Sequence, residues 1–248
     1  MLAIIGGSGL TQLSCLAIER REVVRTPYGE PSGTLTYGSI GPRQVVFLAR
    51  HGHGHTIPPH RVNYRANLWA LVKAAGADNI ISVASVGGMR PDLHPGALVV
   101  PHQIIDYTWG RLATFFDGGD AGVVHVDFTE PYDRALRERL LCAGDAAGFK
   151  VSGSAVYAAT QGPRLESAAE IERLARDGAD IVGMTGMPEA VLARELKTPY
   201  AAVCVVANWA AGRGDSTSSI RFDQIEPVLH ESMGKVRSVI EHLCAASV

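Results

Sequence analysis

The first ten residues, Met1-Leu-Ala-Ile-Ile-Gly-Gly-Ser-Gly-Leu10, join a short apolar run at 2–5 directly to a glycine-rich turn at 6–9. A strand that runs straight into such a turn is typical of α/β proteins, whose ligands bind beyond the carboxyl ends of the strands. The glycines leave backbone N–H groups unhindered and Ser8 adds a hydroxyl, so the turn suits an anion such as phosphate. A simple tight turn explains the same residues at least as well.

Outward from this turn, strand-like and helix-like patterns alternate. Apolar runs of strand length lie at 44–49, 79–84, 97–101, 154–160, 181–184 and 200–206. Helical patterns lie at 63–75, 132–147, 167–177, 189–196 and 225–244, with Ser167 and Gly148 at positions suited to caps. Several strands are continuously apolar, which indicates that both of their faces are covered. The alternation predicts an α/β fold, and the chain has no repeat, linker or composition break, so residues 1–248 are expected to form one domain.

Composition narrows the class of protein. The 248 residues are 46% hydrophobic, carry a formal net charge of −2 and contain four cysteines. This excludes a disordered chain, and without a basic block no nucleic acid or membrane partner is expected. The amino-terminal stretch lacks the basic region of a signal peptide, and the cysteines lack metal-ligand spacing. We therefore expect a cytoplasmic protein that acts on a small molecule.

The Gly-, Pro- and His-rich segments fall where strands should end, at 6–9, 50–60, 85–91, 161–166, 184–188 and 208–219. One of them contains Arg50, His51, His53 and His55. An arginine fork with imidazoles suits an oxyanion. A structural loop ranks second, and a metal site ranks third because the stretch has no carboxylate or cysteine and Arg50 would repel a cation.

The remaining strand-end segments leave their roles open. Thr185 offers a hydroxyl, Glu166 a carboxylate and Met184 an apolar surface, but Glu166 also fits a helix N-terminal charge and Met184 fits core packing. Asn208 is either a turn former or an amide that reads a ligand.

The motifs taken together, in this order, carry a family resemblance. They are the strand-GGSGL opening, TPYGEPS from Thr26, LARHG from Leu48, HTIPPHRVNYRAN from His55, GGMR from Gly87, GPR from Gly162 and GMTGMPE from Gly183. The chain resembles the trimeric purine nucleoside phosphorylases and 5'-methylthioadenosine phosphorylases from about residue 2 to about residue 245.

The resemblance implies a single-domain α/β nucleoside phosphorylase fold with a mixed central β-sheet flanked by helices. It also implies a homotrimer that cleaves a purine nucleoside with inorganic phosphate as co-substrate, without a metal or organic cofactor. Residue by residue, it implies the following site: Ser8, Arg50, His51 and Thr185 for phosphate, with a backbone donor or the Ser85 hydroxyl from a turn at Ala84-Ser85; Met184 against the ribose; His55 and Leu165 lining the pocket; and His125 reaching the 5' substituent in a neighbouring subunit.

Two segments of the sequence depart from the methylthioadenosine pattern. Members specific for adenine carry Asp-x-Asp in the last segment, where this chain has Asn208-Trp209-Ala210, and serine where it has Glu166. Glutamate plus asparagine is the pair with which 6-oxopurine phosphorylases read their base. An ionised Glu166 accepts N1–H of hypoxanthine, while the Asn208 amide donates to O6 and accepts N7–H as the base leaves. Glu166 and Asn208 are therefore the predicted catalytic pair, with Ala210 permissive beside them.

The 5' end of the substrate is indicated by the His-Thr-Ile-Pro segment and the short carboxyl-terminal region, which resemble the methylthio branch. Together the two ends predict phosphorolysis of S-methyl-5'-thioinosine. The alternatives are a general phosphorylase for inosine and guanosine, or a methylthioadenosine phosphorylase. A hydrolytic nucleosidase of related fold and a non-enzymatic nucleoside-binding protein fit less well, because the residue types of a phosphate site are intact.

Overall fold

In the computed structural model, which describes residues 1–118 and 122–246, strand β1 (Leu2–Gly6) lies inside the sheet, between β4 (Arg43–Ala49) and β5 (Asn79–Gly88). Every residue of β1 is buried. Successive side chains point to opposite faces of a strand, and accordingly Ala3 and Ile5 belong to one hydrophobic cluster while Leu2 and Ile4 belong to another. The chain therefore has a core on each face of one sheet.

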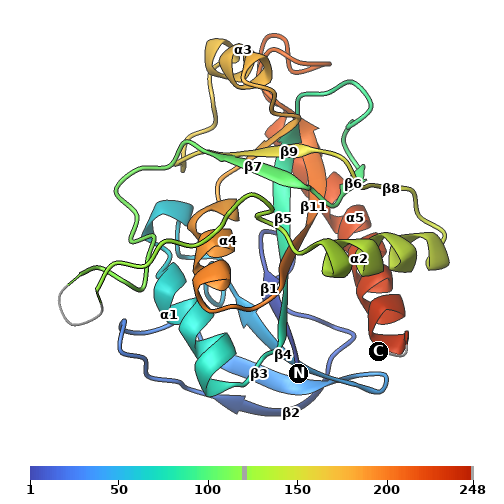
Figure 1. Cartoon of the computed structure of the whole chain (residues 1–248). Helices are drawn as coiled ribbons and strands as arrows, with labels where there is room; N and C mark the ends of the chain where they lie inside the picture. Colours follow the sequence, from blue (N-terminus) through green and yellow to red (C-terminus); the bar gives the residue numbers. More distant parts are fainter. Residues whose placement is uncertain (119–121, 247–248) are drawn as a thin grey trace.

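The sheet is mixed, as expected (Figure 1). Parallel pairs join β1 to β4 and β5, and β5 to β11 (Tyr200–Trp209), while β5 is antiparallel to β10 (Ile181–Gly183). Strand β9 (Val156–Ala159) lies parallel to β10 and to β7 (Gln103–Asp106). The other strands are β2 (Ala17–Glu22), β3 (Leu35–Ile40), β6 (Leu98–Val99) and β8 (Val151–Ser152). Strand β5 thus pairs with three strands: with β11 along most of its length, with β1 near its beginning and with β10 at its end.

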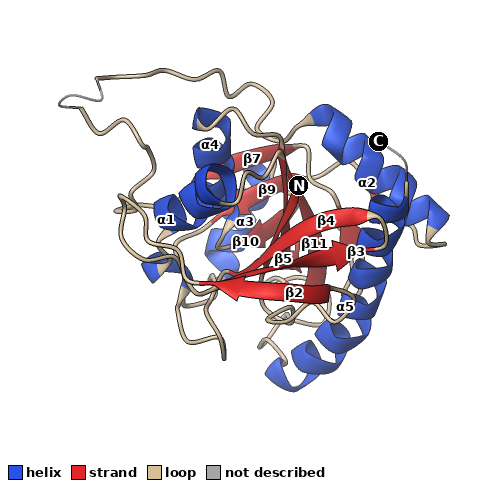
Figure 2. Ribbon diagram, turned by 90° about the horizontal axis from the view of Figure 1, so that it is seen from below, coloured by secondary structure: helices blue, strands red, loops and turns tan. Residues whose placement is uncertain are grey.

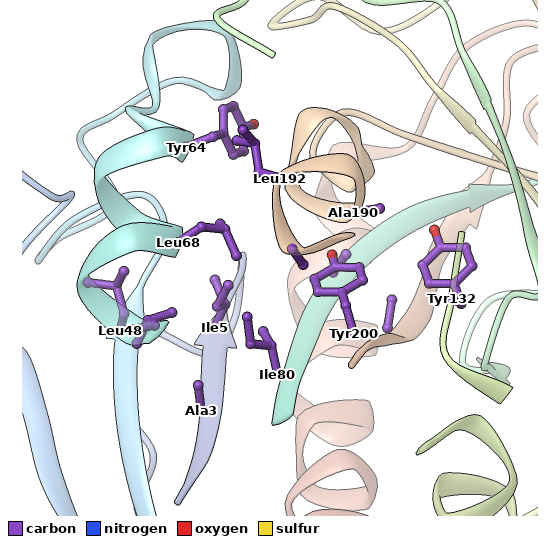
Figure 3. Close-up of a cluster of buried hydrophobic side chains, with 14 of the residues drawn as sticks. Ala3, Ile5, Leu48, Tyr64, Leu68, Ile80, Tyr132, Ala190, Leu192 and Tyr200 are labelled. Atoms are coloured by element: carbon purple, nitrogen blue, oxygen red, sulfur yellow. The ribbon is translucent and has the colours of Figure 1, made fainter. Parts of the chain in front are cut away.

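Helices cover both faces (Figure 2). On one face, α1 (Tyr64–Trp69), continued by a π-helical turn (Ala70–Ala74), packs beside α4 (Gly186–Glu195). Figure 3 shows Tyr64 of α1 beside Leu192 of α4, with Ile5 and Ile80 from the sheet below them. On the other face, α2 (Arg134–Ala146) packs against α5 (Phe222–Ala245).

The short helix α3 (Ala168–Arg176) begins at Ser167, which forms a capping box with Glu170. This confirms the predicted amino-terminal cap, and Gly148, with φ of +77°, follows α2 as predicted. A three-residue 3₁₀ helix (Pro59–Arg61) precedes α1.

The structure corrects two predicted boundaries near the ligand end. Residues 84–85 do not form a turn, because β5 continues to Gly88, and Asn208 lies within β11 rather than in a loop after it. Both extensions contain glycine or polar residues, so the sequence pattern did not indicate that the strands continue. Four strands were not predicted: β2 is exposed at all six positions, β7 and β8 are short, and β3 contains a glycine.

Candidate active site

One large cavity, of about 730 Å³, opens where β1, β4, β5, β10 and β11 end or approach their ends. All predicted site residues except His125 line it: Ser8, Arg50, His51, His55, Ser85, Leu165, Glu166, Met184, Thr185, Asn208 and Ala210. Residues as far apart in sequence as Ser8 and Ala210 thus meet because the strands that precede them converge at this end of the sheet.

Arg50 forms part of the cavity floor and is fully buried. Its Nε donates to Glu189 Oε1 at 2.5 Å, and its Nη2 donates to Glu189 Oε2 at 3.1 Å and to Ser82 Oγ at 2.5 Å. Its Nη1 donates to the Val83 carbonyl at 3.0 Å. Among the residues described, four of its five N–H bonds are therefore directed to protein, and the second Nη1 hydrogen is left for a ligand.

Glu189 neutralises Arg50 and is itself fully satisfied. Besides Arg50, it accepts from Ser82 Oγ at 2.8 Å and from the Tyr200 hydroxyl at 2.9 Å. Burial lowers the pKa of Arg50, but the adjacent carboxylate more than offsets this, so the pKa lies above its ordinary value. A buried ion pair with its remaining lone pairs satisfied holds its geometry tightly, although it adds little net stability.

Sequence reasoning did not identify Ser82, Glu189 or Tyr200 as site residues. Glu189 stands in the Met-Thr-x-x-Pro-Glu motif that carried the resemblance, but a glutamate in a helix's first turn has a structural explanation. Its partner Arg50 lies 139 residues away in the chain, so only the fold brings the two together.

Gly7 allows this arrangement. A Cβ at position 7 would lie 2.5 Å from the Val83 carbonyl oxygen and 2.7 Å from Arg50 Nη1, closer than side-chain carbons approach other atoms. The glycine in the first turn therefore lets the backbone pass over the buried guanidinium, a role distinct from its predicted contribution of free N–H groups.

His51 is held as a neutral ring. Its Nδ1 lies 2.8 Å from the Ile57 carbonyl, which can only accept, so Nδ1 carries the hydrogen and Nε2 is an acceptor. Burial, and then the charge of Arg50, lower the pKa of His51 to about 4. His55 lies beside it, with ring centroids 4.5 Å apart, and its Nε2 is 3.4 Å from Ser8 Oγ. The pKa of His55 is also lowered, by burial and by Arg50.

Thr185 occupies the N-cap position of α4 but makes no side-chain cap bond, and its backbone N–H donates to the Tyr157 hydroxyl at 3.3 Å. With Ser8 and Ser85, it gives this end of the cavity three hydroxyls. Because Arg50 is paired and His51 is neutral, an anion here is held mainly by hydrogen-bond donors.

Glu166 and Asn208 lie along another part of the cavity wall. Thr160 Oγ1 donates to Glu166 Oε1 at 2.6 Å, which leaves Oε2 to accept from a ligand. Asn208 Nδ2 donates to the Trp209 carbonyl at 2.7 Å, so its second amide hydrogen and Oδ1 stay available. Thr160 was not singled out from the sequence.

An irregularity in β11 brings Asn208 to the cavity. The pairing with β5 shifts between Val206 and Asn208, so that Val206 lies opposite Val86 while Asn208 lies opposite Gly87. Neighbouring residues of a regular strand face opposite sides, but this bulge lets both Ala207 and Asn208 line the cavity. Ala210 follows and is buried.

A further stretch of the wall is apolar, and sequence reasoning missed it as part of the site. It comes from α5 and from Ile220, two residues before the helix: Ile220, Phe222, Ile225 and Leu229. The spacing of Phe222, Ile225 and Leu229 by three and four residues marks one face of a helix and is the signal that could have found it. Phe222 is 69% exposed, so this wall lies at the mouth of the cavity.

His125 does not line the cavity and is exposed, in the segment that follows the undescribed residues 119–121. Within residues 1–118 and 122–246, no three His, Cys, Asp or Glu side chains gather as a metal cluster would require. In the same part of the chain, no helix is long and apolar enough to cross a bilayer.

Comparisons with known proteins agree with this geometry. Residues 1–245 match the phosphorylase superfamily. The chain is 54% identical to the probable S-methyl-5'-thioinosine phosphorylase of Pseudomonas syringae pathovar tomato, over 99% of this chain and 98% of the relative. It is 48% identical to the 6-oxopurine nucleoside phosphorylase of Pyrococcus furiosus, over 85% and 80% of the two chains. The methylthioadenosine phosphorylase of Schistosoma mansoni, solved with adenine, has 32% identity and a TM-score of 0.93, over 98% of this chain and 90% of that one.

Proposed function

Because the chain belongs to the phosphorylase superfamily, we propose that it catalyses the phosphorolysis of S-methyl-5'-thioinosine to hypoxanthine and 5-methylthioribose 1-phosphate. The observation that carries this proposal is the meeting of three chemistries in one cavity: the hydroxyls around Arg50, the Glu166–Asn208 pair, and the apolar wall of α5.

At the phosphate end, Ser8, Ser85 and Thr185 donate to the anion, and Arg50 adds its remaining Nη1 hydrogen. HPO₄²⁻ carries one P–OH group, and His51 Nε2 is the acceptor suited to it. A phosphate oxygen then attacks C1' while the C1'–N9 bond breaks, and the bonding electrons leave with the base. The anion beneath the sugar stabilises the oxocarbenium character that develops at C1'.

At the base end, Glu166 Oε2 accepts N1–H and the Asn208 amide donates to O6. As negative charge builds on the purine, Asn208 Oδ1 accepts a hydrogen bond from N7–H. The proton that phosphate gives up ends on hypoxanthine, so atoms and charge balance. Adenine would place its N1 lone pair against the Glu166 carboxylate, which costs ~1–3 kcal/mol for each polar group left unpaired.

The α5 wall favours a methylthio group at C5'. Ile225 and Leu229 offer apolar surface, and a sulfur-bound methyl buries there at a gain of ~25 cal/mol per Å². A 5'-hydroxyl at the same wall would lose its hydrogen bonds to water. This observation ranks S-methyl-5'-thioinosine ahead of inosine, whose cleavage by a general purine nucleoside phosphorylase is the second candidate.

The test is purine release from methylthioinosine, methylthioadenosine and inosine side by side, with and without phosphate. We expect release only with phosphate and the highest kcat/KM for methylthioinosine. Equal rates in phosphate-free buffer would contradict phosphorolysis, and a preference for methylthioadenosine would contradict the base assignment alone.

Phosphate is the only co-substrate proposed, so dialysis against a chelator should leave the rate unchanged. If the rate were lost on dialysis and restored by zinc, this expectation would be wrong.

The working assembly that we propose is a cytoplasmic homotrimer in which His125 reaches the substrate of a neighbouring subunit. Its support is a set of exposed apolar side chains on either side of residues 119–121, two of which stand next to His125 in the sequence: Trp109, Leu112, Val123 and Val124. An active monomer in light scattering would contradict the trimer. An unchanged KM for methylthioinosine in His125→Ala would contradict the shared site.

A further inference from the structure

The half-buried side chain of Arg111 joins two loops of the active site. Its Nη1 donates to the carbonyls of Met184, at 2.8 Å, and Met187, at 2.5 Å. Its Nη2 donates to the carbonyls of Gln161, at 2.9 Å, and Thr160, at 3.3 Å. One guanidinium thus binds four backbone carbonyls, two from the loop after β9 and two from the loop after β10, which runs into α4 as far as Met187, a residue with non-helical backbone angles.

Two more contacts fix the orientation of this guanidinium. Arg111 Nε donates to Gln161 Oε1 at 3.1 Å, and Nη1 lies 3.3 Å from the Tyr64 hydroxyl. The charged group also lies over the Tyr64 ring, with Cζ 5.5 Å from the ring centroid. A planar fork with five N–H donors can reach all these acceptors, whereas an ammonium group cannot span them.

The two loops hold opposite ends of the substrate. After Thr160 and Gln161, the first loop leads to Leu165 and Glu166, while the second begins with Met184 and Thr185. Within the first loop, Thr160 Oγ1 donates to Glu166, so a displacement of Thr160 also displaces the Glu166 carboxylate. Arg111 itself does not line the cavity.

We propose that Arg111 is a positioning residue for the reaction: by binding both loops it sets the distance between the base at Glu166 and the phosphate at Thr185. Attack at C1' needs reacting atoms held at ~3–3.5 Å, and a displacement of ~1 Å can cost ~10²-fold in rate. The role is separate from that of Arg50, which forms part of the cavity floor.

The experiment compares Arg111→Ala and Arg111→Lys with the wild type, and uses Arg65→Ala as the matched control. Arg65 anchors the same segment, through Asp117 and the Thr114 carbonyl, but binds neither loop. We expect kcat for methylthioinosine to fall ~10²-fold in Arg111→Ala and ~10-fold in Arg111→Lys, with a smaller change in KM. Arg65→Ala should retain kcat within ~3-fold, since the partners of Arg65, Thr114 and Asp117, do not line the cavity.

Added guanidinium at millimolar concentration should restore part of the kcat of Arg111→Ala, a readout that a merely structural role would not move. Equal losses in Arg65→Ala and Arg111→Ala, or a kcat unaffected by either Arg111 change, would overturn the proposal. If Arg111→Ala does not fold, Arg111→Lys decides it by the same kcat criterion. The proposal rests on the proposed function, and the wild type separates the two: a wild type without phosphate-dependent activity overturns the function, whereas an active wild type with a fully active Arg111→Ala overturns the positioning role alone.

Discussion

The phosphate end and the base end of the cavity are built differently. At the phosphate end, Arg50 and Glu189 are both fully buried and tied to strands β5 and β11 through Ser82 and Tyr200. At the base end, Glu166 and Asn208 are only half-buried, and among the residues described each makes a single side-chain hydrogen bond to the protein. Under the proposed assignment, the reaction depends on groups that belong to the core, and the choice of purine depends on groups that can change without disturbing it.

The similar proteins differ in the substrates for which they are named. A methylthioadenosine phosphorylase keeps the fold at a TM-score of 0.93, while relatives named for 6-oxopurines and for methylthioinosine are closer in sequence. We expect substitutions at the base end to redirect specificity and substitutions at the phosphate end to cost both activity and stability.

The strongest test of the comparison exchanges the base-reading residues. Glu166→Ser, Asn208→Asp and Ala210→Asp together should lower kcat/KM for methylthioinosine and raise it for methylthioadenosine, because an aspartate at 208 can hold a proton for N7 and accept from the 6-amino group. Wrong pairings at two positions predict a swing of ~10²–10⁴ in the preference ratio, less if the sites couple. The ratio is measured on folded trimeric protein, and an unchanged ratio would contradict the base-end assignment.

Ala210 is buried, so the aspartate placed there enters a tight space near Gly87. The double variant Glu166→Ser, Asn208→Asp serves as the control for this crowding. It should move the ratio in the same direction by a smaller factor.

At the phosphate end, Arg50→Ala should cut kcat/KM by at least ~10²-fold and raise the KM for phosphate, since a charged donor is lost. It also leaves the Glu189 carboxylate buried without its partner, at a cost of ~3–5 kcal/mol in the free energy of unfolding. Steady-state kinetics and urea unfolding measure the two effects.

The matched control for Arg50→Ala is the double change Arg50→Met, Glu189→Leu. Removing both charges should recover much of the stability and none of the activity, because an apolar pair of similar size replaces the ion pair. Wild-type stability and activity in Arg50→Ala alone would show that the phosphate end is not built on this pair.

Stability should also depend on pH through His51. The pKa of this ring is about 4 in the folded chain, below the ~6.5 of an unperturbed histidine, so the unfolded chain binds the proton first. Stability is therefore full above pH ~6.5 and falls as the pH drops towards ~4, by at most about 3 kcal/mol at ~1.4 kcal/mol per unit.

The measurement is the urea midpoint at several values between pH 7.5 and 4.5. His51→Gln should flatten this part of the profile, while His53→Gln, on the exposed part of the same loop, should leave it unchanged. Parallel profiles for wild type and His51→Gln would refute the assignment of this pH dependence to His51.

The smallest effect is expected at Thr160. Thr160→Val removes the hydroxyl that donates to Glu166, and the loss of one hydrogen bond to a charged group predicts a fall of ~10-fold in kcat/KM for methylthioinosine. The KM for phosphate should not change, and Thr160→Ser should retain wild-type kinetics. A raised phosphate KM would mean that the two ends are not independent.

The way the cavity is built also explains which of its features could be predicted from the sequence. Local patterns identified the central strands, such as residues 2–5 before Gly6, since burial on both faces leaves a continuous apolar run. The family motifs identified polar residues of the cavity, such as Ser8, Arg50 and Thr185, but not the apolar wall of α5. Partners brought together by tertiary structure escaped prediction: Glu189 with Arg50, and Arg111 with the two loops. Each of these has an ordinary local explanation until the fold places it against its partner.

The position of Arg50 in the core has a consequence for how fast the protein is degraded in the cell. A ligand that binds only the folded chain stabilises it by RT ln(1 + [L]/Kd), which is ~1.4 kcal/mol when phosphate stands at ten times its Kd. The population of unfolded chain, which proteases attack, then falls about tenfold. If phosphate docks on this core residue as proposed, phosphate supply should affect the abundance of the protein as well as its turnover rate.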